Sequence, residues 1–600
     1  MQRVFVHRVC RFAAAGIAIA ALAWPGFSQT PAAANAYIQH NLVSDVVGLA
    51  DVTDTNLVNP WGLSASAASP FWVSNHDKGN ATVYNGSGAI TPLVVAVPPG
   101  AKGGASGTPT GQVANSATTS FLLSNGRSAS FIFATEDGTI SGFGGSSPAL
   151  LAVDNSAAGA VYKGLAINAT GANPVIYAAN FNSGKIDVFD AKFAPATLAG
   201  AFVDPNLPAG FAPFNIANLG GKLYVTYALQ DAKKFNDVAG RGNGFVDVFD
   251  LNGNFLSRVV SNGPLNSPWG VAIAPANWGA FSSALLVGNF GDGRINAFDA
   301  STGALLGALQ DQNGVTIVNQ GLWALVLGNG KSGGDVNTVY FTAGISNGDT
   351  KTHGLFGALA PPAAVLSVLN GASDLSGAVA PGEIVAVTGG TIGPSPALAA
   401  PAPASGIYGT SLTAPGGITS VTFNGTPAAL LYASASQTNV IVPYSVTGAT
   451  ANVVVKFRDQ TTAAFQVPIA ATAPGLFTLD SSGSGQVVAV NLDGTINSPT
   501  NAAAKGSPVL LFATGEGPTD PPGLDGTVSG RFFHEPLLTP TLTIGGQNAI
   551  VVYAGSGPGL VAGVMEVEAI IPATTASGAI PLVLTAGTAS SQKTATISVK

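Results

Sequence analysis

A repeat of about 50 residues constrains the fold of the N-terminal half more than any other feature of the sequence. Each repeat opens on a short segment that reads Pro-Trp-Gly at 60–62 and again at 268–270, and six such openers occur between Trp61 and Trp323. A spacing of roughly 50 residues is the length of one four-stranded propeller blade. The repeat therefore predicts a six-bladed β-propeller over residues 37–360.

Each opener is followed by two strand-like segments joined at a glycine. In FWVSNHDKGNATVY (71–84) and FIFATEDGTISGF (131–143), apolar residues alternate on both sides of Gly79 and Gly138, a pattern typical of β-hairpins. The last repeat lacks a fourth strand, whereas the segment 37–43 precedes the first opener without a repeat of its own. We predict that these two ends of the propeller pair and close the ring, because closure removes two open sheet edges.

The Pro-Trp-Gly opener followed by a strand ending in Asn resembles six-bladed propellers of the NHL and SMP-30/gluconolactonase type. The stretch from Asn41 to Leu359, with DVAGRGNGFVDVFD (237–250) and HGLFG (353–357), is similar to a family of secreted bacterial propeller proteins without an established activity. The likeness to the lactonase group implies metal-assisted ester hydrolysis, in which a divalent cation polarises a carbonyl.

The residues after Leu359 contain a second internal repeat, in which PGEIVAVTGGTIGP (381–394) matches GSPVLLFATGEGPT (506–519). Each copy has short alternating strands separated by Gly and Pro, as expected of an Ig-like sandwich of about 100 residues. We predict two Ig-like modules, residues 361–478 and 479–600. They are similar to Ig-like or IPT/TIG-like domains at the ends of secreted proteins from soil bacteria, which implies a spacer or surface-attachment role.

The first residues have the pattern of a secretory signal peptide. Three arginines precede an apolar run over residues 12–24, which is short for a bilayer that needs about 20 residues. We expect a signal peptide over residues 1–30 with cleavage between residues 28 and 36. The mature chain would then be secreted, periplasmic or on the cell surface, with no transmembrane segment. The single cysteine, Cys10, lies in this leader, so the mature chain would form no disulfide.

The composition favours an all-β protein and excludes one class of partner. The 77 glycines and 39 prolines supply turn positions between short strands. Charged residues make up only 9% of the chain and the net charge is −7. Nucleic-acid binding requires clustered Lys and Arg that displace counterions from phosphates, so we expect no nucleic-acid partner.

Aligning the repeats places polar residues at equivalent strand ends, which converge near one face of a propeller. We predict a ligand-binding face formed by Asn75, His76, Glu136, Asn180, Tyr227 and Asn289. The alternative for the three asparagines is that their side chains cap the backbone of the hairpin turns. No catalytic residue is assigned.

An insertion at 230–244 interrupts the fourth repeat and is dense in charge for so charge-poor a chain. Long loops on rigid scaffolds often carry function, so the insertion is predicted to be a lid or a partner contact. A solvated loop that aids solubility is the alternative. The charged residues of this loop are Asp231, Lys233, Lys234, Asp237 and Arg241.

Together these features favour non-catalytic recognition. An exported propeller would present its polar face to a small molecule, a saccharide or a protein, with the sandwich modules as spacer or attachment and without a cofactor. One alternative is a metal-dependent hydrolase of the lactonase or esterase kind, with Glu136 and Asn180 as candidate ligands for Ca²⁺, which prefers carboxylate and amide oxygens. Another is a structural envelope protein.

Overall fold

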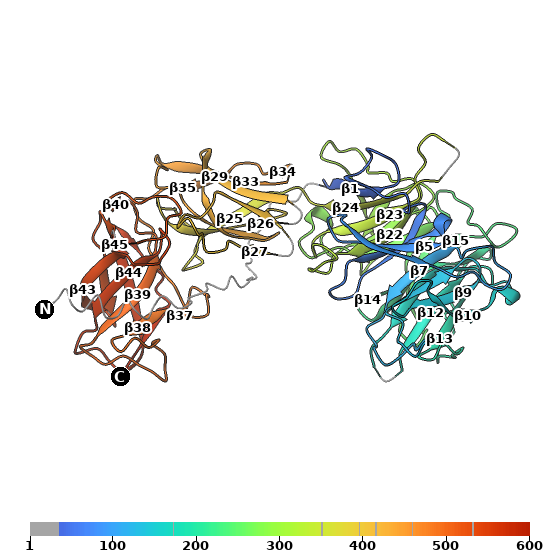
Figure 1. The fold of residues 1–600 in the computed structure, drawn as a ribbon, viewed down its shortest axis with the longest axis horizontal. Helices are drawn as coiled ribbons and strands as arrows, with labels where there is room; N and C mark the ends of the chain where they lie inside the picture. The colour runs from blue at the N-terminus through green and yellow to red at the C-terminus, as the bar shows by residue number, and fades with distance from the viewer. Residues whose placement is uncertain are drawn as a thin grey trace. The chain divides into compact units, whose positions relative to one another are not determined.

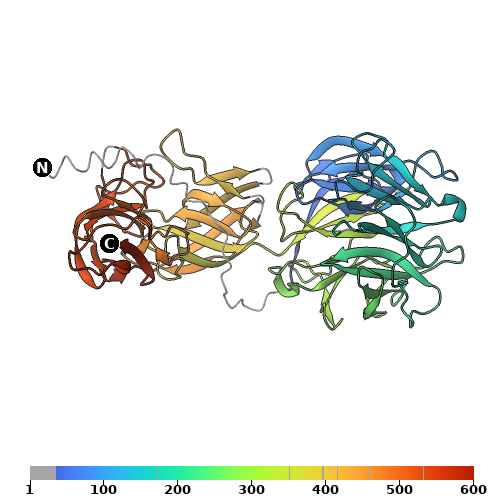
Figure 2. The same ribbon diagram turned by 90° about the horizontal axis from the view of Figure 1, so that it is seen from below.

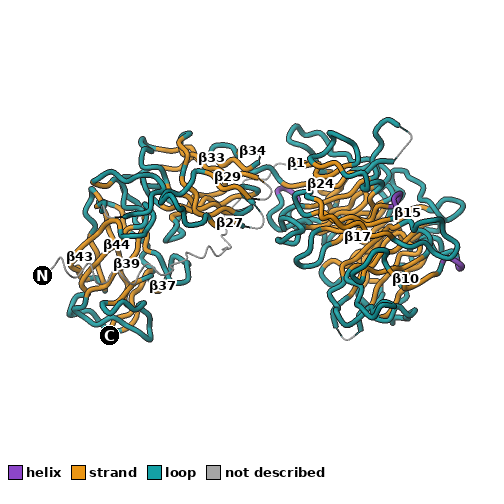
Figure 3. Tube along the Cα trace, viewed as in Figure 1, coloured by secondary structure: helices purple, strands orange, loops and turns teal. Residues whose placement is uncertain are grey.

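The computed structural model describes residues 35–600 except residues 172, 350, 351, 395, 396, 415, 416, 459, 531 and 532. The predicted signal peptide and Cys10 lie outside the described residues. The described chain forms two compact units, residues 35–362 and residues 363–600 (Figure 1). Both are all-β: apart from three single-turn 3₁₀ helices, at 76–78, 156–158 and 279–281, the regular elements of the described residues are strands (Figure 3).

The first unit is a β-propeller of small sheets, and all but the last are built only from strands that follow one another along the chain. Glycine turns between alternating apolar strands produce this pattern, as the repeat predicts. Within the described residues of this unit the six sheets are, in order, β3 (Pro60–Ser64), β4 (Phe71–Asn75), β5 (Asn80–Tyr84) and β6 (Ile90–Ala96); β7 (Pro109–Ala114), β8 (Phe131–Thr135), β9 (Thr139–Phe143) and β10 (Leu150–Asp154); β11 (Tyr162–Asn168), β12 (Val175–Asn180) and β13 (Lys185–Asp190); β14 (Phe211–Leu219), β15 (Lys222–Leu229), β16 (Phe245–Phe249) and β17 (Phe255–Ser261); β18 (Pro268–Ile273), β19 (Leu285–Asn289), β20 (Ile295–Phe298) and β21 (Leu305–Ala308); and β22 (Leu322–Leu327), β23 (Val339–Ala343), β24 (Leu355–Ala360), β1 (Ile38–Ser44) and β2 (Val52–Thr53).

The N-terminal strand completes the last of these sheets. β1 pairs antiparallel with β24, so that Ile38 lies opposite Ala360 and Ser44 lies opposite Leu355. This confirms the pairing predicted from the unmatched segment 37–43. The edge of β24 is thereby covered by the chain's own start rather than left open.

The first strands of the sheets pack against one another in chain order, and β22 returns to β3. The glycine of the opener is required where these strands meet. A Cβ on Gly62 would lie 2.4 Å from the carbonyl oxygen of Thr110, and one on Gly270 would lie 2.4 Å from that of Trp323. No side chain fits at such distances, which explains why glycine follows tryptophan in these openers.

The second unit has two groups of sheets, each with a hydrophobic core of its own, one over residues 365–469 and the other over residues 476–599 (Figure 2). The first group comprises β25 (Ala364–Asn370), β26 (Ile384–Gly390), β32 (Gln437–Ile441), β31 (Ala429–Ala433) and β27 (Leu398–Ala399) in one sheet, and β28 (Ser411–Ala414), β29 (Gly417–Phe423), β33 (Thr450–Phe457), β34 (Gln460–Thr461), β30 (Thr426–Pro427) and β35 (Phe465–Pro468) in another. The second group comprises β36 (Gly475–Leu476), β39 (Pro508–Thr514), β44 (Met565–Ile570), β43 (Gln547–Ser556), β42 (Thr541–Ile544), β45 (Gly578–Ala586), β47 (Ala595–Val599), β37 (Gly485–Gln486), β38 (Ala489–Asn491) and β46 (Ala589–Ser590), with β40 (Thr519–Asp520) paired to β41 (Glu535–Pro536). None of the helices in the described part of the chain is long and apolar enough to cross a membrane.

Candidate functional site

The three asparagines at the strand ends do not form an exposed ring. Asn75, Asn180 and Asn289 are all buried. The amide of Asn75 donates to Oδ1 of Asn80 at 2.9 Å, and that of Asn180 donates to Oδ2 of Asp187 at 2.9 Å. These hydrogen bonds join the two strands of a hairpin. Oδ1 of Asn180 also accepts the N–H of Ser183 in the turn at 3.3 Å, as the capping alternative expects, whereas the side chain of Asn75 makes no capping hydrogen bond.

Tyr227 also departs from the predicted face. Its side chain is buried in a core that contains Tyr177 of the third sheet and Phe245 of the fourth. Burial raises the pKa of the Tyr227 hydroxyl well above its usual range. The side chain therefore fills the space between neighbouring sheets and is not available to a ligand.

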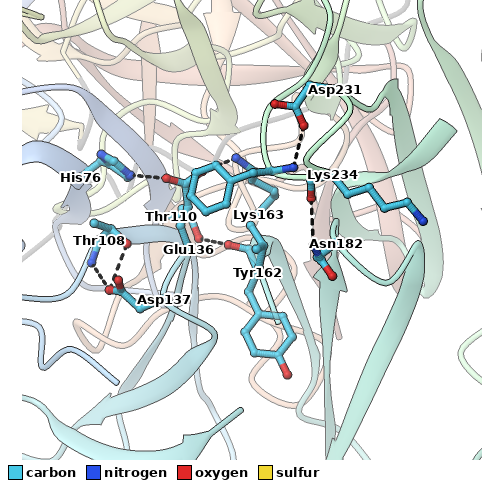
Figure 4. A network of polar contacts seen from close by, with 12 residues as sticks. His76, Thr108, Thr110, Glu136, Asp137, Tyr162, Lys163, Asn182, Asp231 and Lys234 are labelled. Carbon is cyan, nitrogen blue, oxygen red and sulfur yellow. Dashed lines mark hydrogen bonds and ion pairs between the residues drawn. The ribbon is translucent and has the colours of Figure 1, made fainter. Parts of the chain in front are cut away.

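His76 and Glu136 do come together, and they meet a lysine that the sequence analysis missed. Nε2 of His76 lies 2.8 Å from Oε2 of Glu136, and Nζ of Lys163 forms an ion pair with Oε1 of the same carboxylate. Lys163 is only 2% exposed, whereas the His76 side chain is 16% exposed. We call His76, Glu136 and Lys163 the charged cluster (Figure 4).

Local structure explains how three separate repeats supply the charged cluster. His76 follows β4 in the first sheet, Glu136 follows β8 in the second, and Lys163 lies in β11, the first strand of the third. Lys163 precedes the opener glycine, at the position held by Trp61 in the first repeat. The sequence signal for this residue is a lysine at a position where other openers have tryptophan.

Tryptophans of the openers pack against the charged cluster. The imidazole of His76 stacks on Trp61 with ring centroids 5.1 Å apart, and Trp61 stacks on Trp323 at 3.5 Å. Nζ of Lys163 lies 5.2 Å from the Trp61 centroid, within the range of a cation–π interaction. Trp269 meets Trp61 edge-on at 6.4 Å.

Further hydrogen bonds hold His76 in place. Nδ1 of His76 lies 2.6 Å from Oδ1 of Asp77, which also accepts a hydrogen bond from the Asn59 amide at 2.9 Å. Oδ1 of Asn59 in turn accepts a hydrogen bond from Nε1 of Trp323 at 3.2 Å. Because both ring nitrogens of His76 face carboxylate oxygens, its charged form is the one that satisfies them.

The same contacts determine the charge of the cluster. Burial disfavours the imidazolium, but hydrogen bonds to Asp77 and Glu136 outweigh it and raise the pKa of His76 from 6.5 to about 9. Burial likewise opposes ionisation of Glu136, but the hydrogen bond from His76 and the ammonium of Lys163 lower its pKa to about 2. At neutral pH the His76 imidazolium therefore lies between the carboxylates of Asp77 and Glu136, and Glu136 also pairs with Lys163.

We expect the Glu136→Gln variant to lower the pKa of His76 from about 9 toward its ordinary 6.5, because it removes one of two carboxylates that stabilise the imidazolium. A pH titration followed by histidine NMR measures this, with the signals of the other histidines as internal references. An unchanged His76 titration in the variant would contradict the contact. Since the pKa in the folded chain exceeds the unfolded value, the stability that this group contributes is complete below about pH 6.5 and is lost as pH rises through about 9.

The insertion at 230–244 lies against the charged cluster (Figure 4). The ring of Phe235 lies 5.2 Å from Nζ of Lys163. Oδ1 of Asp231 accepts a hydrogen bond from the backbone N–H of Phe235 at 2.9 Å, and the Asn182 amide donates to the carbonyl of Lys234 at 3.3 Å. The insertion thus borders the site, and its aromatic residue makes the contact.

The other charged residues of the insertion take different positions. Lys233 and Arg241 are exposed, whereas Asp237 is half-buried. Burial raises the pKa of the Asp237 carboxyl, and the nearby ammonium of Lys163 opposes that shift. Of the five predicted residues, Asp231, Lys234 and Asp237 therefore lie beside the cluster or within its electrostatic reach.

The oxygens of the two candidate metal ligands have other partners. Both oxygens of Glu136 are engaged by His76 and Lys163, and Oδ1 of Asn180 accepts the N–H groups of Val161 and Ser183. Within the described ranges, no three His, Cys, Asp or Glu side chains form a group that could hold a metal ion.

The comparisons with known proteins find relatives that are named as uncharacterized proteins. No protein-family model matches the chain. The chain is 34% identical over 336 residues to the uncharacterized protein R648 of Acanthamoeba polyphaga mimivirus, a match that covers 53% of this chain and 78% of that protein. The chain belongs to the R648 family. The uncharacterized protein L690 of the same virus is 38% identical over 204 residues, which cover 33% of this chain and 51% of L690.

Similar solved structures are β-propeller proteins with little sequence in common with this member of the R648 family. Streptogramin B lyase is 13% identical with a TM-score of 0.32 and covers 54% of this chain and 97% of its own. The PQQ-bound aldose sugar dehydrogenase of Streptomyces coelicolor is 14% identical with a TM-score of 0.32 and covers 55% and 100%. R648 and L690 are viral proteins, so these relatives do not support a bacterial source. The Ig-like identity of the C-terminal modules stays a prediction.

Proposed function

We propose that the first unit is a closed six-bladed propeller whose face around the charged cluster binds a small polar ligand. In this proposal the second unit consists of two Ig-like sandwiches that act as a spacer or surface attachment for an exported protein. The rigid sheets position the cluster, and the insertion at 230–244 forms a lid at its border.

The observation that carries the proposal is the buried ion pair between Lys163 and Glu136. Burying such a pair costs desolvation energy, and well-packed apolar residues often stabilise a core as well or better. The first repeat uses Trp61 at the position of Lys163, so an apolar solution is compatible with the fold. Strongly shifted pKa values such as those of His76 and Glu136 cluster at functional sites. Recognition of a ligand explains the charges better than packing does.

A thermal-shift screen of the full chain tests this proposal. The panel contains neutral mono- and disaccharides, amino acids and small organic acids, because a compound that binds only the folded state raises the unfolding temperature. We expect at least one class to raise it in the wild type and to lose most of that effect in Glu136→Gln. Glu535→Gln, which changes an exposed glutamate of the second unit, is the matched control. A shift of equal size in Glu136→Gln would contradict the assignment of the site.

A further inference from the structure

Two buried hydrogen-bond donors beside the charged cluster have no acceptor among the described residues. They are the indole N–H groups of Trp61 and Trp269, whose rings meet edge-on with centroids 6.4 Å apart. Both side chains are about 95% buried, with 5% and 4% of their surface exposed. A buried donor without an acceptor is unfavourable and is rare in folded proteins. These two groups therefore point to an acceptor supplied from outside the chain.

The charged groups at this place add to the surplus of donors. The ammonium of Lys163 has three N–H groups, and among the described residues it has one hydrogen-bond acceptor, Oε1 of Glu136. The other oxygen of Glu136 is taken by His76. With Asp77, which contacts Nδ1 of His76 at 2.6 Å, the charges at this place balance, but the remaining N–H groups of Lys163 and the two indoles are donors without an acceptor among the described residues.

The surroundings of these donors are apolar and partly open. Phe235 of the insertion lies over Lys163 with 38% of its surface exposed. Phe290, which is half-buried, stacks on Trp323 with centroids 4.1 Å apart. A ligand that satisfies the donors would meet aromatic rings on its other sides, and flat apolar groups pack well against such rings.

We propose that the ligand of this site is a small carboxylate with a flat apolar body, whose oxygens accept hydrogen bonds from Lys163 and from the indoles of Trp61 and Trp269. This inference rests on the proposed function and names the ligand class of the same site. One carboxylate brings several charged acceptor positions at once, which suits the unpaired N–H groups of Lys163 and the two indoles. The body of the ligand lies against Phe235 and Phe290.

Calorimetric titration of the full chain with sodium benzoate tests the proposal, with benzamide as the neutral compound of the same shape. We expect benzamide to bind at least about tenfold more weakly, because an amide lacks the charge. Trp61→Phe and Trp269→Phe keep an aromatic ring but remove the N–H, and each should weaken benzoate about five- to tenfold. Trp278→Phe is the control: its indole N–H is also buried without a partner, but it belongs to a different core, and the affinity should not change.

The outcomes separate this inference from the function on which it rests. Equal binding of benzoate and benzamide, or full benzoate affinity in both Trp61→Phe and Trp269→Phe, would overturn the carboxylate proposal. If neutral saccharides raise the unfolding temperature in a way that Glu136→Gln abolishes while benzoate does not bind, the site stands and the ligand class is wrong. If no panel compound and neither probe binds, both proposals fail.

Discussion

Replacing Lys163 with methionine is expected to lower the unfolding free energy of the first unit by about 3 kcal/mol, because one oxygen of the buried Glu136 carboxylate loses its charged hydrogen-bond donor. Glu136 would keep only His76 as a partner in a site where Lys163 is 2% exposed. Urea unfolding followed by tryptophan fluorescence measures the effect. Every tryptophan of the described residues lies in the first unit, so the signal reports on the propeller alone.

Two further variants make this prediction specific. Lys222→Met applies the same change to an exposed lysine of β15, and it should alter stability by no more than about 0.5 kcal/mol. The double variant Lys163→Met/Glu136→Gln should recover part of the loss, since a neutral amide is less costly to bury without Lys163 than a carboxylate is. If Lys163→Met unfolds at the same urea concentration as Lys222→Met, the buried pair does not have the energetic role assigned to it.

Replacing Tyr37 with alanine is the second change with a large expected effect, about 3–5 kcal/mol, the range for removing a large buried aromatic side chain. Tyr37 immediately precedes β1 and is buried, with its ring 4.3 Å from that of Trp278. Its hydroxyl donates to the carbonyl of Trp278 at 3.0 Å and accepts from the N–H of Phe281 at 3.2 Å. It thus attaches the N-terminal strand to the segment between β18 and β19 of the neighbouring sheet.

The Tyr37→Phe variant separates the ring from the hydroxyl and should cost about 1 kcal/mol, because it removes only the hydrogen bonds. The same fluorescence-detected unfolding compares the two variants. If Tyr37→Ala is as stable as the wild type, the attachment of the N-terminal segment contributes little to the unfolding free energy of the first unit.

The sheets of the first unit could be predicted from the sequence because close packing restricts which residues are possible at regular positions. Neighbouring first strands approach so closely at Gly62 and Gly270 that glycine is needed at a regular interval. The pairing of β1 with β24 followed from counting strands, since one repeat lacked a strand and the segment 37–43 lacked a repeat. The internal structure of the second unit was harder to predict, because Gly- and Pro-rich strands give only a weak pattern.

The site was predicted only in part, for reasons that lie in the side chains. His76 and Glu136 were found because strand ends in equivalent repeats meet. The asparagines were hard to assign because Asn at a hairpin is equally suited to turn hydrogen bonds, such as the one that Oδ1 of Asn180 accepts from the N–H of Ser183. Lys163 was not predicted because it stands at an opener position, which the repeat explains without reference to its charge. In the insertion the charges were noticed, whereas the contact with the cluster is made by Phe235.

The most direct test of the central claim, that the charged cluster is the ligand site, is the histidine NMR signal of His76 during titration with the panel compound that most raises the unfolding temperature. The account predicts that the His76 signal moves with the same saturation as the thermal shift, while that of His534, in the second unit, stays in place. A compound that stabilises the chain and leaves the His76 signal unmoved throughout the titration would contradict the claim.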